Sequence, residues 1–206
     1  MKIVKKYSHL NGEEYLLVHK SSLYQEIQDA IATVNASKFR TKVSKERGRQ
    51  GKMLFSPGEI NKEFERVFGA LGWEPVTRYF YVSDNYTTVK IIEPMEYEEQ
   101  KEYLEAKGIP LIRSYNQTDF VKDNVAVEVQ LGKYFAVTYD LFVKHLSFYT
   151  AGLIDVGVEI VPSKEMQRRM SSGPPFFEKE VHNVMRHGRT TPPVPIIMLG
   201  IEPKNL

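Results

Sequence analysis

The stretch SYNQTDFVKDNVAVEVQLGKY, residues 114–134, has the pattern of two strands joined by a tight turn. In its second half, apolar and other side chains alternate, which is typical of a strand with one buried face. One face holds Val125, Val127, Val129 and Leu131, and the other holds Ala126, Glu128 and Gln130. The polar pair Asp123–Asn124 tolerates positive φ and predicts a hairpin between residues 116–122 and 125–131.

The turn fixes the register of this predicted hairpin. Residue numbers that pair across it sum to 247, so Asp119 stands opposite Glu128 and Gln117 faces Gln130. Directly opposed Cβ atoms lie about 5 Å apart in such a ladder. The sequence therefore predicts two neighbouring carboxylates on one face of the sheet.

Two carboxylates this close repel each other unless a positive charge lies between them. No Lys or Arg shares this face of the hairpin from residue 117 to 130, so a divalent cation is the expected partner. Carboxylates, a strand carbonyl and water are the hard oxygen ligands that Mg²⁺ prefers. Asp119, Glu128, Val129 and Gln130 thus indicate a metal-dependent phosphodiesterase site. The alternative is a hairpin face exposed to water, but the uniformly apolar opposite face favours a site.

Composition places the chain in the α/β class as a single domain over residues 1–206. Its 206 residues are 42% hydrophobic, enough for one substantial core. The chain has no cysteine, which excludes disulfides, zinc–thiolate sites and thiol nucleophiles. Neither a signal peptide after Met1 nor an apolar run of ~18 residues is present, so we expect a cytoplasmic protein with no membrane contact.

The net charge of +2 is distributed unevenly, with seven cations and one acid between residues 38 and 52. The cations are Lys38, Arg40, Lys42, Lys45, Arg47, Arg49 and Lys52. Such a segment is either a clamp for DNA phosphates or a basic loop in water, and alone it favours neither. The run from Gly48 to Lys52 lacks the spacing of a phosphate loop, so no nucleotide cofactor is expected.

The rest of the chain alternates between strand and helix patterns. A first hairpin around Asn11–Gly12, joining residues 2–8 and 14–19, and a β-rich segment over residues 74–91 are expected. Helices are predicted at residues 23–34, 57–71, 93–107, 140–150 and 176–187, the second of them purely structural, and interior strands at 153–161 and 195–201. The loop from Arg168 to Gly173 carries Ser171 and Ser172, whose hydroxyls are short enough to reach base edges.

Four segments together resemble type II restriction endonucleases of the BstYI group, which are related to BglII and BamHI. They are residues 7–12 (YSHLNG), 115–123 (YNQTDFVKD), 139–145 (YDLFVKH) and 170–173 (MSSG). Asp119, Glu128 and Gln130 map onto the family's variant of the PD-(D/E)-x-K nuclease motif. Thr118 stands where proline is common, and Gln130 replaces the usual lysine.

The resemblance implies a mixed five- or six-stranded sheet flanked by helices and Mg²⁺-dependent hydrolysis of double-stranded DNA. Asp119, Glu128 and the Val129 carbonyl would surround the metal, and Gln130 would orient the attacking water. The implied target is purine-GATC-pyrimidine, cut after its first base to leave a four-base 5′ overhang. Lys133, Ser171 and Ser172 would approach the bases, while Arg40, Lys42, Lys45, Arg47 and Arg49 would bind DNA from the basic segment.

A palindromic target further predicts a homodimer, because each chain carries one active site. Its expected interface is the stripe of Phe142, Leu146 and Tyr149, which leaves Leu141, Val143 and Phe148 to face the chain's own sheet. A helix buried wholly within one subunit is the alternative. For function, the alternatives are a repair or junction-resolving nuclease of the same fold, a DNA-binding protein without activity, and a metal-stiffened structural hairpin.

Overall fold

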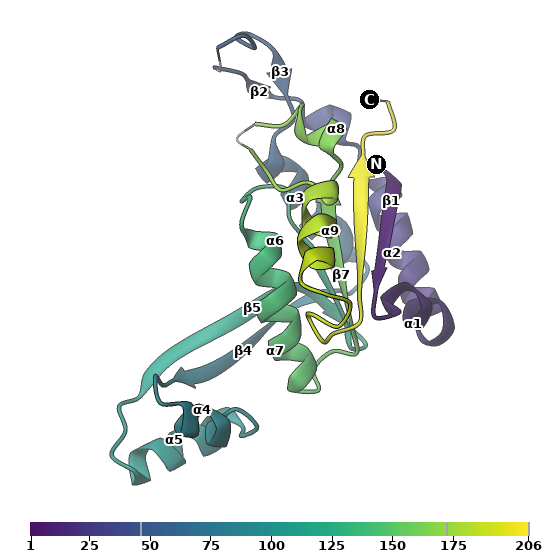
Figure 1. Cartoon of the computed structure of the whole chain (residues 1–206). Coiled ribbons are helices and arrows are strands. Elements are labelled where there is room, and N and C mark those ends of the chain that lie inside the picture. Colours follow the sequence, from purple (N-terminus) through teal and green to yellow (C-terminus); the bar gives the residue numbers. More distant parts are fainter. Residues whose placement is uncertain (46, 172, 206) are drawn as a thin grey trace.

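A mixed six-stranded sheet forms the centre of the computed structural model, which describes residues 1–45, 47–171 and 173–205 (Figure 1). Its strand order is β1-β8-β7-β6-β5-β4. The strands are β1 (Lys2–His9), β4 (Glu74–Val82), β5 (Ile112–Lys122), β6 (Val125–Val129), β7 (Val156–Pro162) and β8 (Ile196–Glu202). The parallel strands β6, β7 and β8 occupy its middle, with antiparallel partners on both sides. The predicted α/β fold and sheet are confirmed.

Helices cover both faces of this sheet, giving three layers. On one face lie α1 (Gly12–His19), α2 (Ser21–Thr33) and α3 (Pro57–Ala70), whose apolar side chains join the largest buried cluster. On the other face, α6 (Ala136–Tyr139), the π-helical turn η2 (Asp140–Lys144) and α7 (His145–Thr150) follow one another directly beside α9 (Phe177–Arg186). The predicted helix at residues 140–150 therefore begins four residues earlier, at Ala136.

The central hairpin has the predicted register. Phe120, Val121 and Lys122 pair with Val127, Ala126 and Val125, and each of these pairs sums to 247. Asp123 and Asn124 both have positive φ, 45° and 61°, as a tight two-residue turn requires. All five residues of β6 are buried, because α-helices cover both faces of the strand.

The predicted first hairpin is wrong, since Gly12 begins helix α1 instead of a second strand. Leu10 and Asn11 do turn the chain through positive φ, but β1 pairs with the distant strand β8. A Cβ on Gly12 would lie 2.4 Å from the carbonyl carbon of Ile196, so the turn packs directly on the β8 backbone. Leu16 of α1 is consequently fully buried in the core.

Strands β4 and β5 continue beyond the sheet as a long antiparallel arm (Figure 1). Two short helices, α4 (Tyr86–Ile92) and α5 (Tyr97–Ala106), pack at its end around Tyr81, Ile92 and Leu104. Helix α4 contradicts the expected β-rich segment over residues 74–91, because the Asn85 side chain accepts a hydrogen bond from Thr88 N and caps a helix.

A second protrusion at the other end of the molecule carries the basic segment. Strands β2 (Lys42–Val43) and β3 (Met53–Leu54) form a short ribbon after the 3₁₀ helix η1 (Ala36–Phe39), near α8 (Lys164–Gln167) (Figure 1). Within the described ranges, no helix is long and apolar enough to cross a membrane.

Candidate active site

Asp119 lies where strands β5 and β6 separate. The regular ladder ends at the pair Phe120–Val127, and Oδ2 of Asp119 then accepts a hydrogen bond from the main-chain N–H of Val129 at 3.0 Å. Asp119 is therefore held by the β6 backbone next to Glu128, instead of standing opposite Glu128 in a ladder pair. This bond fixes one carboxylate oxygen and leaves the other free to face the adjoining cavity.

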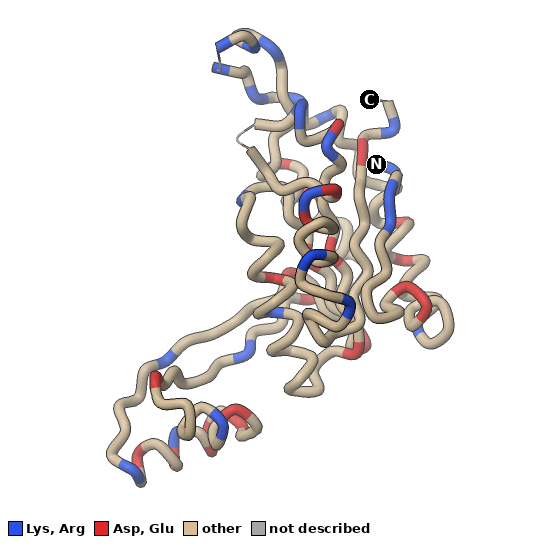
Figure 2. The backbone as a smooth tube through the Cα atoms, viewed as in Figure 1, with Lys and Arg blue, Asp and Glu red and all other residues tan. Residues whose placement is uncertain are grey.

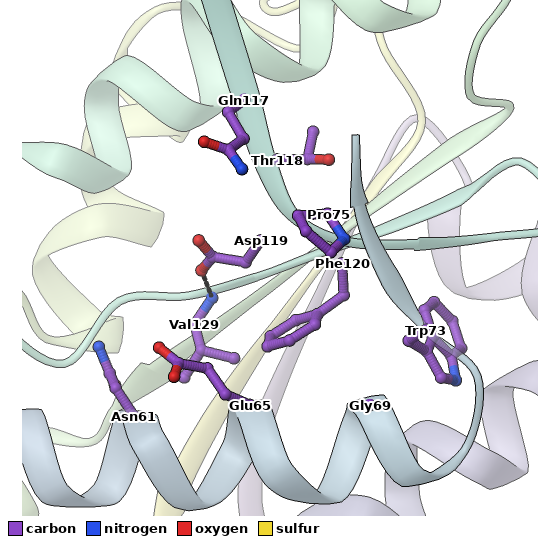
Figure 3. Close-up of a pocket in the computed structure, with 10 residues that line it drawn as sticks. All are labelled: Asn61, Glu65, Gly69, Trp73, Pro75, Gln117, Thr118, Asp119, Phe120 and Val129. Carbon is purple, nitrogen blue, oxygen red and sulfur yellow. Dashed lines mark hydrogen bonds between the residues drawn. The ribbon is translucent and has the colours of Figure 1, made fainter. Parts of the chain in front are cut away.

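A cavity of about 500 Å³ opens beside Asp119, between the hairpin and helix α3 (Figure 3). Asn61 and Glu65, one turn apart on α3, line it together with Asp119 and Val129 (Figure 3). The prediction that α3 is purely structural missed this carboxylate. The apolar face of α3, with Phe64 and Phe68 in the core, turns Asn61 and Glu65 toward the hairpin.

An adjoining groove of about 550 Å³ shares Asn61 and Gln117 with this cavity. It continues past the end of β6 to the helix that begins at Ala136. Its further polar lining comprises Gln130, Lys133, Asp140 and Lys144. The predicted pair Gln117 and Gln130 thus line one groove, although the regular β5–β6 ladder ends before reaching them.

Glu128 differs from the prediction in its surroundings, because its side chain is fully buried and a lysine contacts it. Lys144 of η2 places Nζ 2.8 Å from Glu128 Oε1 and 2.8 Å from Asp140 Oδ1. The hairpin face itself carries no cation, as the sequence indicates, but the helix packed on that face supplies one. The repulsion between Asp119 and Glu128 is therefore relieved in part without a metal ion.

The electrostatics of these groups follow from burial and from their neighbours. Burial, with Asp119 and Asp140 nearby, raises the pKa of Glu128, and Lys144 opposes that increase. Burial also raises the pKa of Asp140, whereas Lys144 and the polar amide of Gln130 lower it. Burial alone would lower the pKa of Lys144, but Glu128 and Asp140 outweigh it and raise that pKa. Lys144 is consequently charged at neutral pH.

A second buried acid, Glu159, lies next to Glu128 on the parallel strand β7. Its Oε2 is 3.4 Å from Nε2 of His145, and both side chains are fully buried. Burial lowers the pKa of His145 to about 3, and burial raises the pKa of Glu159 well above its ordinary value. Both groups are therefore stabilised in their neutral forms by the interior of the protein.

The donors around the cavity fit a hard divalent cation. Asp119, Glu65 and Val129 line the cavity, whereas Glu128 is fully buried next to Val129 and its Oε2 has no hydrogen-bond partner in the described part of the chain. Within residues 1–45, 47–171 and 173–205, no three His, Cys, Asp or Glu side chains form a ready metal-binding group. Mg²⁺ is a hard cation that binds through one or two carboxylates and completes its shell with water and substrate phosphate.

The predicted DNA-binding residues form two groups. Lys133 is exposed and lines the groove with Gln130. Arg40, Lys42, Lys45, Arg47 and Arg49 lie on or near the β2–β3 ribbon, away from the groove. Arg49 Nη1 donates to the carbonyl of Arg168 at 2.9 Å, which joins the ribbon to the loop of Ser171. Ser172, the other predicted base contact, lies outside the described residues.

The predicted dimer stripe is packed partly within the chain. Phe142 and Leu146 are half-buried against the cluster around α9, whereas Tyr149 is exposed. Leu141 and Phe148 face the sheet as predicted, but Val143 is 41% exposed, so its predicted inward position is wrong. The π-helical turn rotates Val143 outward while Asp140 and Lys144 face inward.

A six-stranded mixed sheet with two carboxylates where β5 and β6 separate is typical of a nuclease with the restriction-endonuclease fold. The family model for "Restriction endonuclease BglII/BglIII" matches residues 4–201, and the chain belongs to this family. It is a type II restriction endonuclease, an enzyme that cleaves DNA at specific sites, and enzymes of this kind generally use divalent metal ions.

The fold is also similar to that of the restriction endonuclease BglII solved in complex with a DNA 16-mer. The two share 16% sequence identity and a TM-score of 0.65, over 97% of this chain and 76% of that chain. Among curated protein sequences, no relative matches. At this identity the likeness concerns the fold alone.

Replacing Glu159 with glutamine is expected to stabilise the protein increasingly as the pH rises. Folding raises the pKa of Glu159 above its ordinary value of 4.5. The folded state therefore loses stability as the pH rises above 4.5, because the carboxyl group ionises more readily in the unfolded chain. The difference in unfolding free energy between Glu159→Gln and the wild type should grow by up to about 1.4 kcal/mol per pH unit above that value. Denaturant titration at pH 5 and pH 8 measures it.

The matched control is Glu102→Gln on the exposed surface of α5, which should show no such pH dependence. An equal effect of Glu159→Gln at both pH values would contradict the assignment of a raised pKa to Glu159.

Proposed function

We propose that the protein cleaves purine-GATC-pyrimidine in a Mg²⁺-dependent reaction, after the first base, as the resemblance to the BstYI group implies. The observation that supports this proposal is that Asp119, Val129 and Glu65 line one cavity while Gln130 and Lys133 line the groove beside it. Incubation of purified protein and plasmid with Mg²⁺ tests it. Discrete fragments with four-base 5′ overhangs support the proposal, and branch-dependent cutting or binding without cleavage overturns it.

Asp119, Glu128 and the carbonyl of Val129 are the proposed metal ligands, with Glu65 facing the same cavity. A bound Mg²⁺ supplies Lewis acidity and lowers the pKa of a coordinated water. Gln130 cannot accept a proton at neutral pH, so its amide is assigned to holding the attacking water in line with the phosphate. Asp119 is fixed for its role by the Val129 N–H bond before any substrate arrives.

Asp119→Asn and Glu128→Gln are each expected to abolish cleavage while sequence-specific DNA binding remains. Both substitutions keep the size of the side chain and remove an anionic ligand of the metal. A nicking assay with Mg²⁺ measures cleavage, and a gel-shift assay with Ca²⁺ measures binding.

Asp123→Asn is the matched control, since Asp123 lies exposed in the turn of the same hairpin and asparagine accepts positive φ. Cleavage at the wild-type rate by either of the two site variants would show that the hairpin is misassigned.

Base contacts and phosphate contacts are proposed to come from different parts of the chain, Lys133 in the groove and Lys45 and Arg47 on the ribbon. Lys133→Ala should change the relative cutting of related sites by roughly 1 to 3 kcal/mol at one base pair. Lys45→Ala with Arg47→Ala should weaken binding to all sequences and flatten the salt dependence by about one unit of slope per lost contact.

The Lys133 variant and the ribbon variant serve as controls for each other. Relative cutting of related sites and the salt dependence of binding are therefore measured for both variants. Lys101→Ala on α5 with Lys107→Ala, at the C-cap of that helix, controls for charge alone, because α5 lies at the end of the molecule remote from the ribbon (Figure 2). An unchanged salt slope in the ribbon variant would identify that segment as a loop in water.

A homodimer is proposed to form through the outer face of the helix from Ala136 to Thr150. Val143 and Tyr149 are exposed there beside half-buried Leu146, and one active site per chain cuts one strand of a palindrome. Val143→Lys is expected to give a folded monomer that nicks poorly and makes no double-strand cuts, because a lysine opposes apolar contact between copies. Sedimentation at micromolar concentration measures the oligomeric state.

Val18→Lys on α1, which covers the opposite face of the sheet, is the control and should remain dimeric. Wild-type protein that sediments as a monomer both with and without cognate DNA would exclude the dimer.

A further inference from the structure

Five buried ionisable residues lie behind the candidate active site, between the sheet and the helix from Ala136 to Thr150. Two come from the sheet and three from the helix: Glu128, Glu159, Asp140, Lys144 and His145. Three of them carry carboxylates, and His145 is held neutral by burial. Lys144 is therefore the cation of this cluster.

Lys144 contacts two carboxylates at once. Its Nζ lies 2.8 Å from Oε1 of Glu128 and 2.8 Å from Oδ1 of Asp140, and its side chain is only 11% exposed. Ion pairs removed from water are less screened than surface pairs, and loss of one partner leaves an uncompensated buried charge. This ion pair is the contact of Oε1 of Glu128, and among the described residues neither oxygen of that carboxylate has a further hydrogen-bond partner.

The same lysine acts on Gln130 through Asp140. The side chains of Gln130 and Asp140 line the same groove, and Oδ1 of Asp140 is paired with Lys144 at 2.8 Å, so the Asp140 carboxylate lies between the ammonium group and the Gln130 amide. Gln130, Asp140 and Lys144 all line the groove beside the cavity, so this chain of contacts reaches the surface where the substrate is proposed to lie. Asp140 and Lys144 are the first and last residues of the π-helical turn, and such turns are frequent at functional sites.

We propose that Lys144 is a positioning residue for DNA cleavage, which orients Glu128 directly and Gln130 through Asp140. The inference rests on the proposed function for the roles of Glu128 and Gln130. One ammonium group then aligns two of the three residues assigned to the reaction, although it lies 16 and 14 positions beyond them in the chain. A lysine that only stabilised the fold would have no reason to connect with both.

The experiment compares Lys144→Met with wild type and with Lys122→Met. Lys122 is the matched control, because its Nζ also pairs with a glutamate at 2.8 Å, Oε2 of Glu26, but contacts none of the site residues. Lys144→Met should lower kcat by about 10- to 100-fold, as loss of an outer partner of a metal ligand does. KM and metal-free binding of the same DNA should stay unchanged, and Lys144→Arg, which keeps the charge, should recover part of the rate.

A second readout needs neither metal nor DNA. The side-chain amide resonances of ¹⁵N-labelled Gln130, assigned by their absence from Gln130→Glu, should move in Lys144→Met and in Asp140→Asn, and stay in place in Lys122→Met. The two substitutions should also be non-additive in kcat, because they interrupt one chain of contacts. Asp140→Asn, which keeps the side chain's size, provides this test if Lys144→Met fails to fold.

Wild-type kcat in Lys144→Met, or unmoved Gln130 resonances in both variants, would overturn the proposal. So would equal losses in Lys144→Met and Lys122→Met, because that result indicates a general effect on stability. These outcomes are distinguishable from failure of the proposed function. In that case the wild-type protein itself does not cut DNA, but the resonance shifts still report whether the contacts of Lys144 exist.

Discussion

Lys144 joins the sheet to the helix that lies over it, because its ammonium group is carried by the helix and contacts Glu128 of strand β6. Glu128 is fully buried in strand β6, and Asp140 lies one turn from Lys144 on the same helix, so the 2.8 Å contact with Glu128 is the one that spans the two layers. The next residue, His145, confirms how close that approach is. A Cβ on Gly157 of β7 would lie 2.7 Å from Nδ1 of His145, so only glycine accommodates the helix there.

Such a buried ionic cluster does not arise from selection for stability alone. Replacing a buried ion pair with well-packed apolar residues of similar size is often neutral or stabilising, whereas removing one partner is strongly destabilising. The surrounding layers offset this cost with an extensive apolar core, in which α1, α2 and α3 pack on the strands. If Lys144 positions Glu128 and Gln130 as proposed, the ionic cluster serves to hold these two residues in one geometry next to the cavity.

The hairpin register could be predicted from the sequence because it depends on neighbours in the chain. Alternation in β6 and a turn at Asp123–Asn124 suffice to align Phe120 with Val127. The first hairpin could not be predicted, since the partner of β1 is β8, nearly the whole chain away. Lys144 was missed for a similar reason, although Asp140 and Lys144 four residues apart in an otherwise apolar helix are a visible signal of a buried pair.

The carboxylates of the candidate site and the basic residues of the ribbon lie in different parts of the molecule. Asp119 and Glu65 line the cavity beside the hairpin and Glu128 is buried next to Val129, and carboxylates at this site would repel DNA phosphates in the absence of a cation. The basic residues of the ribbon and of the loop at Arg168 lie at one end, joined by the bond from Arg49 to the Arg168 carbonyl. Under the proposed function, attraction at that end would hold a duplex over the acidic centre, and a divalent cation would bring the phosphate and the carboxylates together.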